Sequence, residues 1–330
     1  MARSLLNSRS LLCWAPLVAL CIMISDRPAN AKATYVTFGD CCVVRGINAA
    51  STVVGWRGDG NSAMRSVDGT ITIIAVPGAT QTFATGINDG GTVMGLYLDN
   101  SGAAHGFLRA TDGTITSFNL PHGASSTELH AINNKNEIAG DYIDDADHSH
   151  GFVRTSSGAI KTFDPPGANY TYGMSINDKG FVTGSYITDG NGLHSFLRAA
   201  DGTITTIDVP GADSTEATSI NIKGSVAGSY GTSDGVEHGF IRASNGSITS
   251  FDEPKCSLLR PVGINRKGAV AGFCLNSEHQ GHFFGFSLRP NGKSKKFQVP
   301  QGGTRTIPVG MNDAGVIAGN YAFGGFLRFP

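Results

Sequence analysis

The sequence predicts an all-β fold, a seven-bladed β-propeller of four-stranded blades whose ring is closed by an N-terminal strand. Three observations support it: a repeat of about 44 residues, turn residues that recur in each repeat, and a last repeat that lacks one strand, which a segment near the N-terminus can supply. Glycine accounts for 45 of the 330 residues and charged residues for 15%, which excludes a coiled coil and a charged disordered chain.

The repeat is defined by a small residue, then Ile or Met, then Asn. The seven asparagines are Asn48, Asn88, Asn133, Asn177, Asn221, Asn265 and Asn312. A glycine stands seven residues after each of them: Gly55, Gly95, Gly140, Gly184, Gly228, Gly272 and Gly319. This constant register indicates one structural unit repeated along the chain.

Within one unit, residues 81–120 contain four short runs typical of β-strands, at 81–87, 92–98, 105–109 and 114–120. Glycine-rich segments between the first and second runs, and between the third and fourth, suit tight hairpins because their residues tolerate positive φ. Each unit is therefore predicted to be an antiparallel four-stranded sheet. Such sheets, arranged radially, bury their faces against one another.

The strand count predicts how the ring closes. Six units are complete between residues 42 and 297, and the last one, from residue 298, stops after its third strand at 325–328. Residues 34–38 match a fourth strand such as 114–118. We therefore expect residues 34–38 to supply the missing strand, giving 28 strands and hiding the sheet edges that would promote aggregation.

Residues 1–31 are typical of a secretory signal peptide. Arg3 and Arg9 precede an apolar run at 11–24, and Ala29-Asn30-Ala31 offers the small residues required for cleavage. The run is shorter than the ~20 residues of a membrane anchor, and a lipoprotein site at Cys21 would follow Leu20 where a small residue is needed. We expect one domain, residues 32–330, that is secreted or periplasmic, soluble and monomeric.

Four cysteines remain after cleavage, in a compartment that permits disulfides. Cys256 precedes a first strand and Cys274 ends the second strand of the same unit, so antiparallel pairing brings them together. We predict a disulfide between these two. The adjacent Cys41 and Cys42 then either bridge each other or stay reduced.

Short motifs recur in the repeat, among them His-Gly-Phe-Leu-Arg at 105–109, Gly-x-Tyr at 95–97 and Asp-x-Pro at 208–210. In these motifs the chain resembles the HAF family of probable extracellular repeats over residues 34–330. The motif histidines are His105, His150, His194 and His238. The resemblance implies export and a β-rich repeat, and it implies no activity, substrate or catalytic residue. Because blades are spread around a ring, we expect each histidine to make a local hydrogen bond within its own blade.

Composition and motifs narrow the function. Lys plus Arg (25) nearly equals Asp plus Glu (26), so no bulk positive field favours nucleic acid or an anionic membrane. No catalytic residue, cofactor or metal site is assigned from the motifs. The acidic loop with Asp144, Asp145, Asp147 and His148 is either a calcium loop or a solvated turn, and its spacing favours the turn.

A ligand site is expected where the units differ, because residues common to every unit maintain packing. Because the strands of a unit are antiparallel, the starts of the first strands and the ends of the second strands lie at the same end of every sheet. The proline-containing connections lie at this end too, and we name it the proline face. Near it, the positions five and three residues before each asparagine vary and supply Arg45, Glu128, His130, Tyr172, Glu216 and Arg260.

These charged and aromatic side chains suit a polar ligand such as a sugar. The sequence therefore favours an exported binding or scaffold protein for a glycan, another extracellular polymer or an extracellular protein. The alternative is a propeller enzyme, a glycan-directed hydrolase or lyase, whose noncontiguous site lies in the central channel.

Overall fold

The computed structural model describes residues 33–121, 126–190, 192–279, 281–300 and 302–330. Within these ranges every regular element is a β-strand, and there are 28 of them. No helix in the described part of the chain is long and apolar enough to cross a membrane. The predicted signal peptide, residues 1–31, lies outside the described residues.

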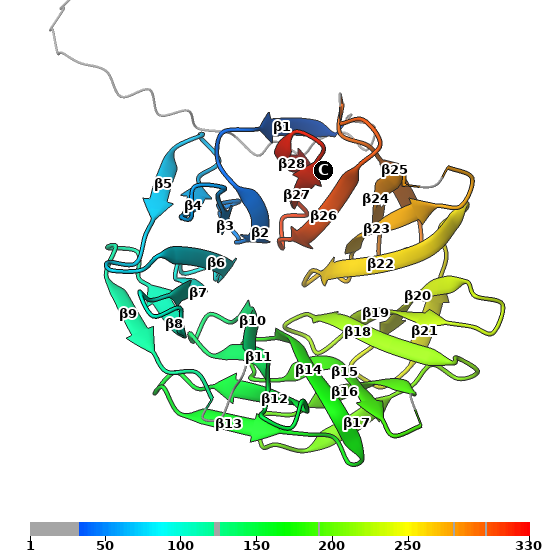
Figure 1. Ribbon diagram of the computed structural model, residues 1–330. Coiled ribbons are helices and arrows are strands. Elements are labelled where there is room, and N and C mark those ends of the chain that lie inside the picture. The colour runs from blue at the N-terminus through cyan, green and yellow to red at the C-terminus, as the bar shows by residue number, and fades with distance from the viewer. Residues whose placement is uncertain (1–32, 122–125, 191, 280, 301) are drawn as a thin grey trace, which may run out of the picture. The chain divides into compact units, whose positions relative to one another are not determined.

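The strands follow the predicted order of four per unit. The first strands, which lie innermost in Figure 1, are β2 (Val43–Ile47), β6 (Gln81–Ile87), β10 (Ser126–Ile132), β14 (Ala168–Ile176), β18 (Ser214–Ile220), β22 (Cys256–Ile264) and β26 (Thr306–Met311). The second strands are β3 (Val53–Trp56), β7 (Val93–Leu98), β11 (Ile138–Ile143), β15 (Val182–Thr188), β19 (Val226–Gly231), β23 (Val270–Asn276) and β27 (Ile317–Tyr321). The third strands are β4 (Ser62–Arg65), β8 (Ala104–Arg109), β12 (Ser149–Arg154), β16 (Leu193–Arg198), β20 (Glu237–Arg242), β24 (Phe283–Leu288) and β28 (Gly324–Phe329). The fourth strands are β5 (Ile71–Ile74), β9 (Ile115–Phe118), β13 (Ile160–Phe163), β17 (Ile204–Ile207), β21 (Ile248–Phe251), β25 (Ser294–Phe297) and, from the N-terminus, β1 (Thr34–Phe38).

Consecutive strands of a unit pair antiparallel, and the pairings form four four-stranded sheets and one twelve-stranded sheet. The larger sheet comprises three units, β10 to β21. Two parallel bridges join these units, each through one residue pair: Ser149↔Tyr170 between β12 and β14, and Leu193↔Ser214 between β16 and β18. The all-β prediction is confirmed, with the sheets following one another around a common centre (Figure 1).

The N-terminal strand pairs with the last strand of the chain, as predicted. β1 runs antiparallel to β28, from Thr34↔Phe329 to Phe38↔Gly325. On its other side, the guanidinium of Arg65 in β4 lies over the Phe38 ring at 4.6 Å. Arg154 stands in the same way over Phe118 of the preceding unit, at 4.3 Å. The terminal strand therefore occupies the place that a fourth strand has elsewhere.

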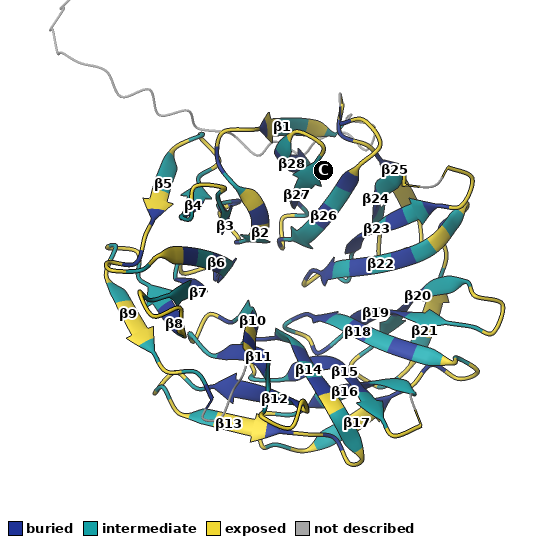
Figure 2. Cartoon of the chain, in the orientation of Figure 1, coloured by how far each residue is buried: buried dark blue, intermediate teal, exposed yellow. Residues whose placement is uncertain are grey.

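The hydrophobic core lies between neighbouring sheets. One cluster joins Val54 and Ile74 of the first unit to Ala84 and Phe107 of the next. Six third-strand phenylalanines are fully buried at equivalent places: Phe107, Phe152, Phe196, Phe240, Phe286 and Phe326. Figure 2 shows the consequence, since β11 and β12 are mostly buried while the outer strands β9 and β13 carry exposed residues. Apolar burial between sheets thus drives the arrangement.

Candidate functional site

A β-bulge interrupts every first strand close to the residue three before its asparagine. The register shifts fall between Val44/Gly46, Ala84/Gly86, Leu129/Ala131, Tyr172/Ser175, Ala217/Ser219, Pro261/Gly263 and Pro308/Gly310. A bulge leaves one residue unpaired and re-aims its side chain. Arg45 and His130, both named from the sequence, are such residues.

The recurring glycine of the second strand makes room for this bulge. A Cβ on Gly140 would overlap the carbonyl oxygen of Glu128 and approach the Phe152 ring to 3.0 Å. All seven glycines of this set would meet the carbonyl of the equivalent first-strand residue. Because a backbone carbonyl cannot move aside as a flexible side chain does, only glycine fits the position.

Five of the seven bulges place their unpaired residue in the wall of a central cavity of about 310 Å³, which we name the channel cavity. Residues of all seven first strands contribute to its wall, including Arg45, Thr85 and His130. The Oγ atoms of Thr85 and Ser219 are buried there and have no hydrogen-bond partner among the described residues. Ser219 is 7% exposed. Arg266, Asp89, Asp178 and Asp313 also line it, so the cavity combines charges of both signs with two unpaired hydroxyls.

Five of the repeat asparagines line this cavity, and hydrogen bonds link asparagines of neighbouring units. The Nδ2 of Asn88 donates to the carbonyl of Asn133 (3.0 Å), and that of Asn133 donates to Asn177 (3.0 Å). Further links of this kind run from Asn48 to Asn88, Asn177 to Asn221, Asn221 to Asn265 and Asn312 to Asn48. Each Oδ1 accepts from the turn that follows it, as in Thr92 N to Asn88 (2.9 Å). Each asparagine thus bonds its own turn, and six of the seven also bond the next unit.

His130 forms the first polar cluster among the sequence candidates. Its Nε2 lies 2.7 Å from Asp141 Oδ1 and 3.7 Å from Glu128 Oε2. Burial lowers the pKa of His130, but the hydrogen bond and charge of Asp141, with the charge of Glu128, outweigh it and raise the pKa above its usual value. Burial, and then the charge of Asp141, raise the pKa of the nearby Tyr172 phenol. Glu128, His130 and Tyr172 thus come together around one buried carboxylate, which sequence reasoning missed.

Arg260 forms the second cluster, across two neighbouring units. Its Nη1 donates to Glu216 Oε2 and to Ser229 Oγ (3.2 Å), and its Nη2 donates to Glu237 Oε1 (3.4 Å). Burial raises the pKa of Glu237, with Arg260 opposing and Glu216 reinforcing the shift. Arg260 and Glu216, both candidates from the sequence, are therefore partners of each other. Arg45 belongs to neither cluster and lies exposed in the channel cavity.

The motif histidines make the local hydrogen bonds that the sequence predicts. His194 and His238 each place Nδ1 against the aspartate that ends the same unit, Asp208 (3.0 Å) and Asp252 (2.6 Å). His105 instead uses Asp99, at 3.0 Å. Each ring also stands beside the tyrosine of the second strand, as Tyr97 and His105 do at 5.0 Å. In the units of His150, His194 and His238, the histidine, the second-strand tyrosine and the aspartate of the Asp-x-Pro motif therefore form one packed group.

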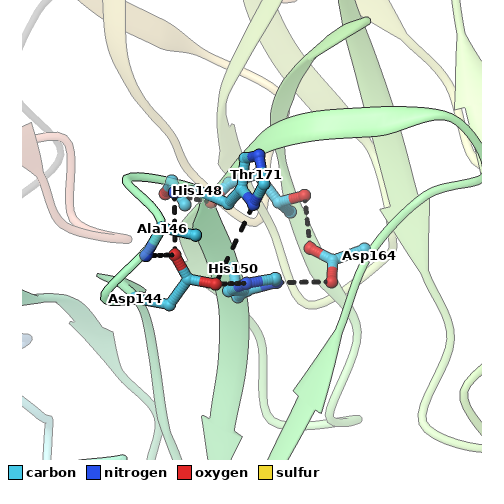
Figure 3. A network of polar contacts seen from close by, with 7 residues as sticks. Asp144, Ala146, His148, His150, Asp164 and Thr171 are labelled. Carbon is cyan, nitrogen blue, oxygen red and sulfur yellow. Dashed lines mark hydrogen bonds and ion pairs between the residues drawn. The ribbon is translucent and has the colours of Figure 1, made fainter. Parts of the chain in front are cut away.

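His150 joins this group to the acidic loop (Figure 3). Its Nδ1 contacts Asp164 (2.8 Å), which also accepts from Thr171 Oγ1 (2.7 Å), and its Nε2 contacts Asp144 (3.2 Å). The other oxygen of Asp144 accepts from the backbone amides of residues 146 and 148. No group of three or more metal-ligating side chains occurs within the described ranges. Asp144 thus orders its own turn.

The predicted disulfide between Cys256 and Cys274 is present, with the two Cα atoms 5.6 Å apart. Cys256 is the first residue of β22 rather than preceding the strand, and it stands opposite Asn276, while Cys274 stands opposite Leu259. A bulge between Cys256 and Leu258 accompanies this diagonal bridge. Cys41 and Cys42 are free thiols with their Sγ atoms 2.7 Å apart.

No family model matches this sequence, and no curated protein matches it. Solved β-propeller proteins are similar in fold. Virginiamycin B lyase from Staphylococcus aureus is 14% identical, with 90% of this chain and 98% of that chain covered and a TM-score of 0.63. A catalytically inactive variant of that enzyme, with a histidine replaced by alanine and solved with quinupristin, is 15% identical over 90% and 98%, with a TM-score of 0.61. The β-propeller domain of the Trilobed protease from Pyrococcus furiosus is 9% identical over 84% and 90%, with a TM-score of 0.57. At these identities the likeness concerns the fold alone.

Proposed function

We propose that residues 33–330 form a seven-bladed β-propeller in which β1 completes the last blade. The twelve-stranded sheet then consists of three blades joined at single residue pairs. Support comes from the asparagine hydrogen bonds, which run through the units in order from Asn48 to Asn265 and return from Asn312 to Asn48. Between the sixth and seventh units, the backbone nitrogen of Arg266 donates instead to Asp313. The stacking of Arg65 on Phe38 also places the first unit, which contains β4, next to the last unit, which contains β1.

The proposal extends to function: the protein is a secreted or periplasmic monomer that binds a carbohydrate in the channel cavity, as a binding or scaffold module. Two groups that line this cavity carry the inference: the unpaired, buried hydroxyl of Ser219 and the exposed side chain of Arg45. Such groups bond the hydroxyls of a sugar, and an unpaired buried hydroxyl is costly without a partner. Glu128 and Tyr172 extend the site toward the proline face, where Glu216 and Arg260 form its polar rim. The balanced charge argues against nucleic acid or membrane partners.

A glycan array with residues 33–330 tests this function. Once a bound glycan is identified, Arg45→Ala and Ser219→Ala should each weaken binding about tenfold, a loss of about 1.4 kcal/mol. Lys293→Ala is the control and should bind normally, because Lys293 is exposed in a turn and does not line the channel cavity. Wild-type affinity in both cavity variants, or no glycan bound at all, would refute the proposal.

One observation favours an enzyme as the second candidate. His130 is held by Asp141 at the wall of the channel cavity, the arrangement that positions an imidazole as a general base. The fold is shared with a lyase for which a histidine variant is inactive. A glycan-directed hydrolase or lyase would release reducing ends or unsaturated products from a polysaccharide, and His130→Ala would abolish this. Equal product from wild type and His130→Ala would exclude His130 as the base.

A further inference from the structure

Cys41 and Cys42 lie in the short connection between the closing strand β1 and β2. Cys41 is 4% exposed and packs in the same core cluster as Phe38 and Val44, while Cys42 is half-buried. The two Sγ atoms, 2.7 Å apart, are closer than thiols that merely pack against one another. The pair is therefore arranged for a reaction between its own sulfur atoms.

Both thiols border a second cavity, of about 430 Å³, that we name the seam cavity. Its wall comprises residues 39–43, the hairpin at Trp56 to Asp59, and Asn320, Tyr321, Ala322 and Gly324 of the last unit. The cavity thus lies between the segment that leaves β1 and the β27–β28 hairpin. Because Cys41 is only 4% exposed, a disulfide that reacts with its sulfur atom would have to enter through this cavity.

The surroundings make the two thiols unequal. The hydrogen bond with Cys42 lowers the pKa of the Cys41 thiol, and the charges of Arg65 and Arg57 act in the same direction against burial. That hydrogen bond and burial raise the pKa of Cys42. Arg57 also donates to the carbonyls of Asp40 (3.4 Å) and Cys41 (3.2 Å), which holds the segment in place. A thiolate beside a thiol is the usual arrangement of a redox-active pair.

We propose that Cys41 and Cys42 form a redox site at which a low-molecular-weight or protein disulfide closes a vicinal disulfide. The Cys41 thiolate attacks the disulfide R–S–S–R, forming a mixed disulfide and expelling one thiolate. Cys42 then loses its proton and attacks Cys41 Sγ, expelling the second thiolate. The two cysteines lose two electrons and two protons, and R–S–S–R becomes two R–SH.

The site adjoins the contacts that hold β1 to the rest of the fold. Asn320 in β27 uses its side-chain amide to bond both backbone groups of Val44, at 2.8 Å to the nitrogen and 3.0 Å to the oxygen. Phe38, the last residue of β1, precedes the cysteine pair in the chain, and Val44 follows it. Closing the disulfide restricts the backbone torsions of residues 41 and 42. The oxidised pair therefore keeps β1 docked, and the reduced pair lets it exchange more readily.

The test uses the full chain purified without reductant from an oxidising compartment, in a Cys256→Ser/Cys274→Ser background so that reductant acts on one pair only. Peptide mass spectrometry should find residues 41 and 42 in one peptide lighter by two hydrogen atoms, and dithiothreitol should restore the missing mass. Hydrogen exchange at the amides of β1 should then become several-fold faster. In the matched variant that also carries Cys41→Ser and Cys42→Ser, dithiothreitol should have no effect.

Two results would overturn the inference. One is a peptide with both thiols free, or bridged to another chain, in the protein as purified. The other is an equal acceleration of exchange in the variant without Cys41 and Cys42. If the background variant does not fold, alkylation of the wild-type protein before and after graded reduction gives the same answer, since Cys41 and Cys42 should become alkylated as a pair.

Discussion

Phe38 of β1 lies directly across Gly325 of β28, and a Cβ at Gly325 would overlap its ring. The same relationship joins Phe118 to Gly106, where strand and glycine belong to one continuous unit. Two segments at opposite ends of the chain thus reproduce a contact that occurs within four internal units. The closing strand is therefore held by side-chain packing as well as by its backbone hydrogen bonds.

This contact predicts that Phe38→Ala destabilises the fold by about 3–5 kcal/mol, because it empties a buried site and removes the ring under Arg65. Urea unfolding followed by fluorescence measures the loss. Phe323→Ala, which changes a side chain that is 70% exposed, is the control and should shift the midpoint little. Similar midpoints for the two variants would show that β1 contributes little to ring closure.

Much of the fold could be predicted from the sequence because the repeat marks turns and strands with the same residues each time. Residues 34–38 were placed as a strand, and the structure has β1 over the same five residues. The Cys256–Cys274 bridge followed from antiparallel pairing. Both predictions use only the order of strands and turns along the chain, which the repeat marks with recurring residues.

The site was harder to predict because its contacts join different units. Arg260 and Glu216 are 44 residues apart and occupy the same repeat position in neighbouring units, so opposite charges at equivalent positions were the available signal. Asp141, the partner of His130, lies on the second strand, whose variable positions were not compared. The bulge that aims His130 depends on a close approach of two backbones, and the recurring glycine was its only trace in the sequence.

That close approach predicts a difference between two Gly→Ala variants. Gly140→Ala should destabilise the protein by about 1–3 kcal/mol or more, because the added methyl overlaps the Glu128 carbonyl beside the bulge. Gly58→Ala should be nearly neutral, since nothing lies within 4 Å of its added Cβ. Thermal unfolding of both variants checks the pair. Equal stability would mean that the glycine is not required by packing.

Loss of the disulfide should cost about 3 kcal/mol in the Cys256→Ser/Cys274→Ser variant, as expected for a bridge spanning 18 residues. The cost arises because the bridge restricts the unfolded chain. Unfolding in guanidinium, with and without reductant, measures it. In reductant, where Cys41 and Cys42 are reduced in both proteins, the wild type should be about as stable as the variant. A variant as stable as the wild type without reductant would contradict this.

The pKa of His130 is raised in the folded protein, which gives the pH dependence a definite sign. Its pairing with Asp141 and Glu128 stabilises the fold fully below the unfolded histidine pKa of about 6.5, and this stabilisation is lost as the pH rises through the folded value. The difference in unfolding free energy between wild type and His130→Gln should therefore be largest below about pH 6.5 and should shrink as the pH rises above it. Because the pKa of His150 is raised as well, the comparison with His130→Gln isolates one group. A difference that grows with pH would reverse the assignment.

Arg260 provides the last prediction, because its contacts bear on both stability and binding. Removing its guanidinium leaves Glu216 and Glu237, each about a quarter exposed, without their shared cation. Arg260→Ala should therefore destabilise the fold by about 1–3 kcal/mol, less than a fully buried pair would lose. In a Glu216→Gln background the same substitution should cost less, by about 1 kcal/mol, since one of the stranded charges is already gone. Arg289→Ala, on an exposed turn, is the control and should change stability little. Urea unfolding of the four cycle members gives the coupling. A coupling near zero would mean that the ion cluster does not hold the units together, and a weaker glycan affinity in Arg260→Ala would then report direct contact with the ligand.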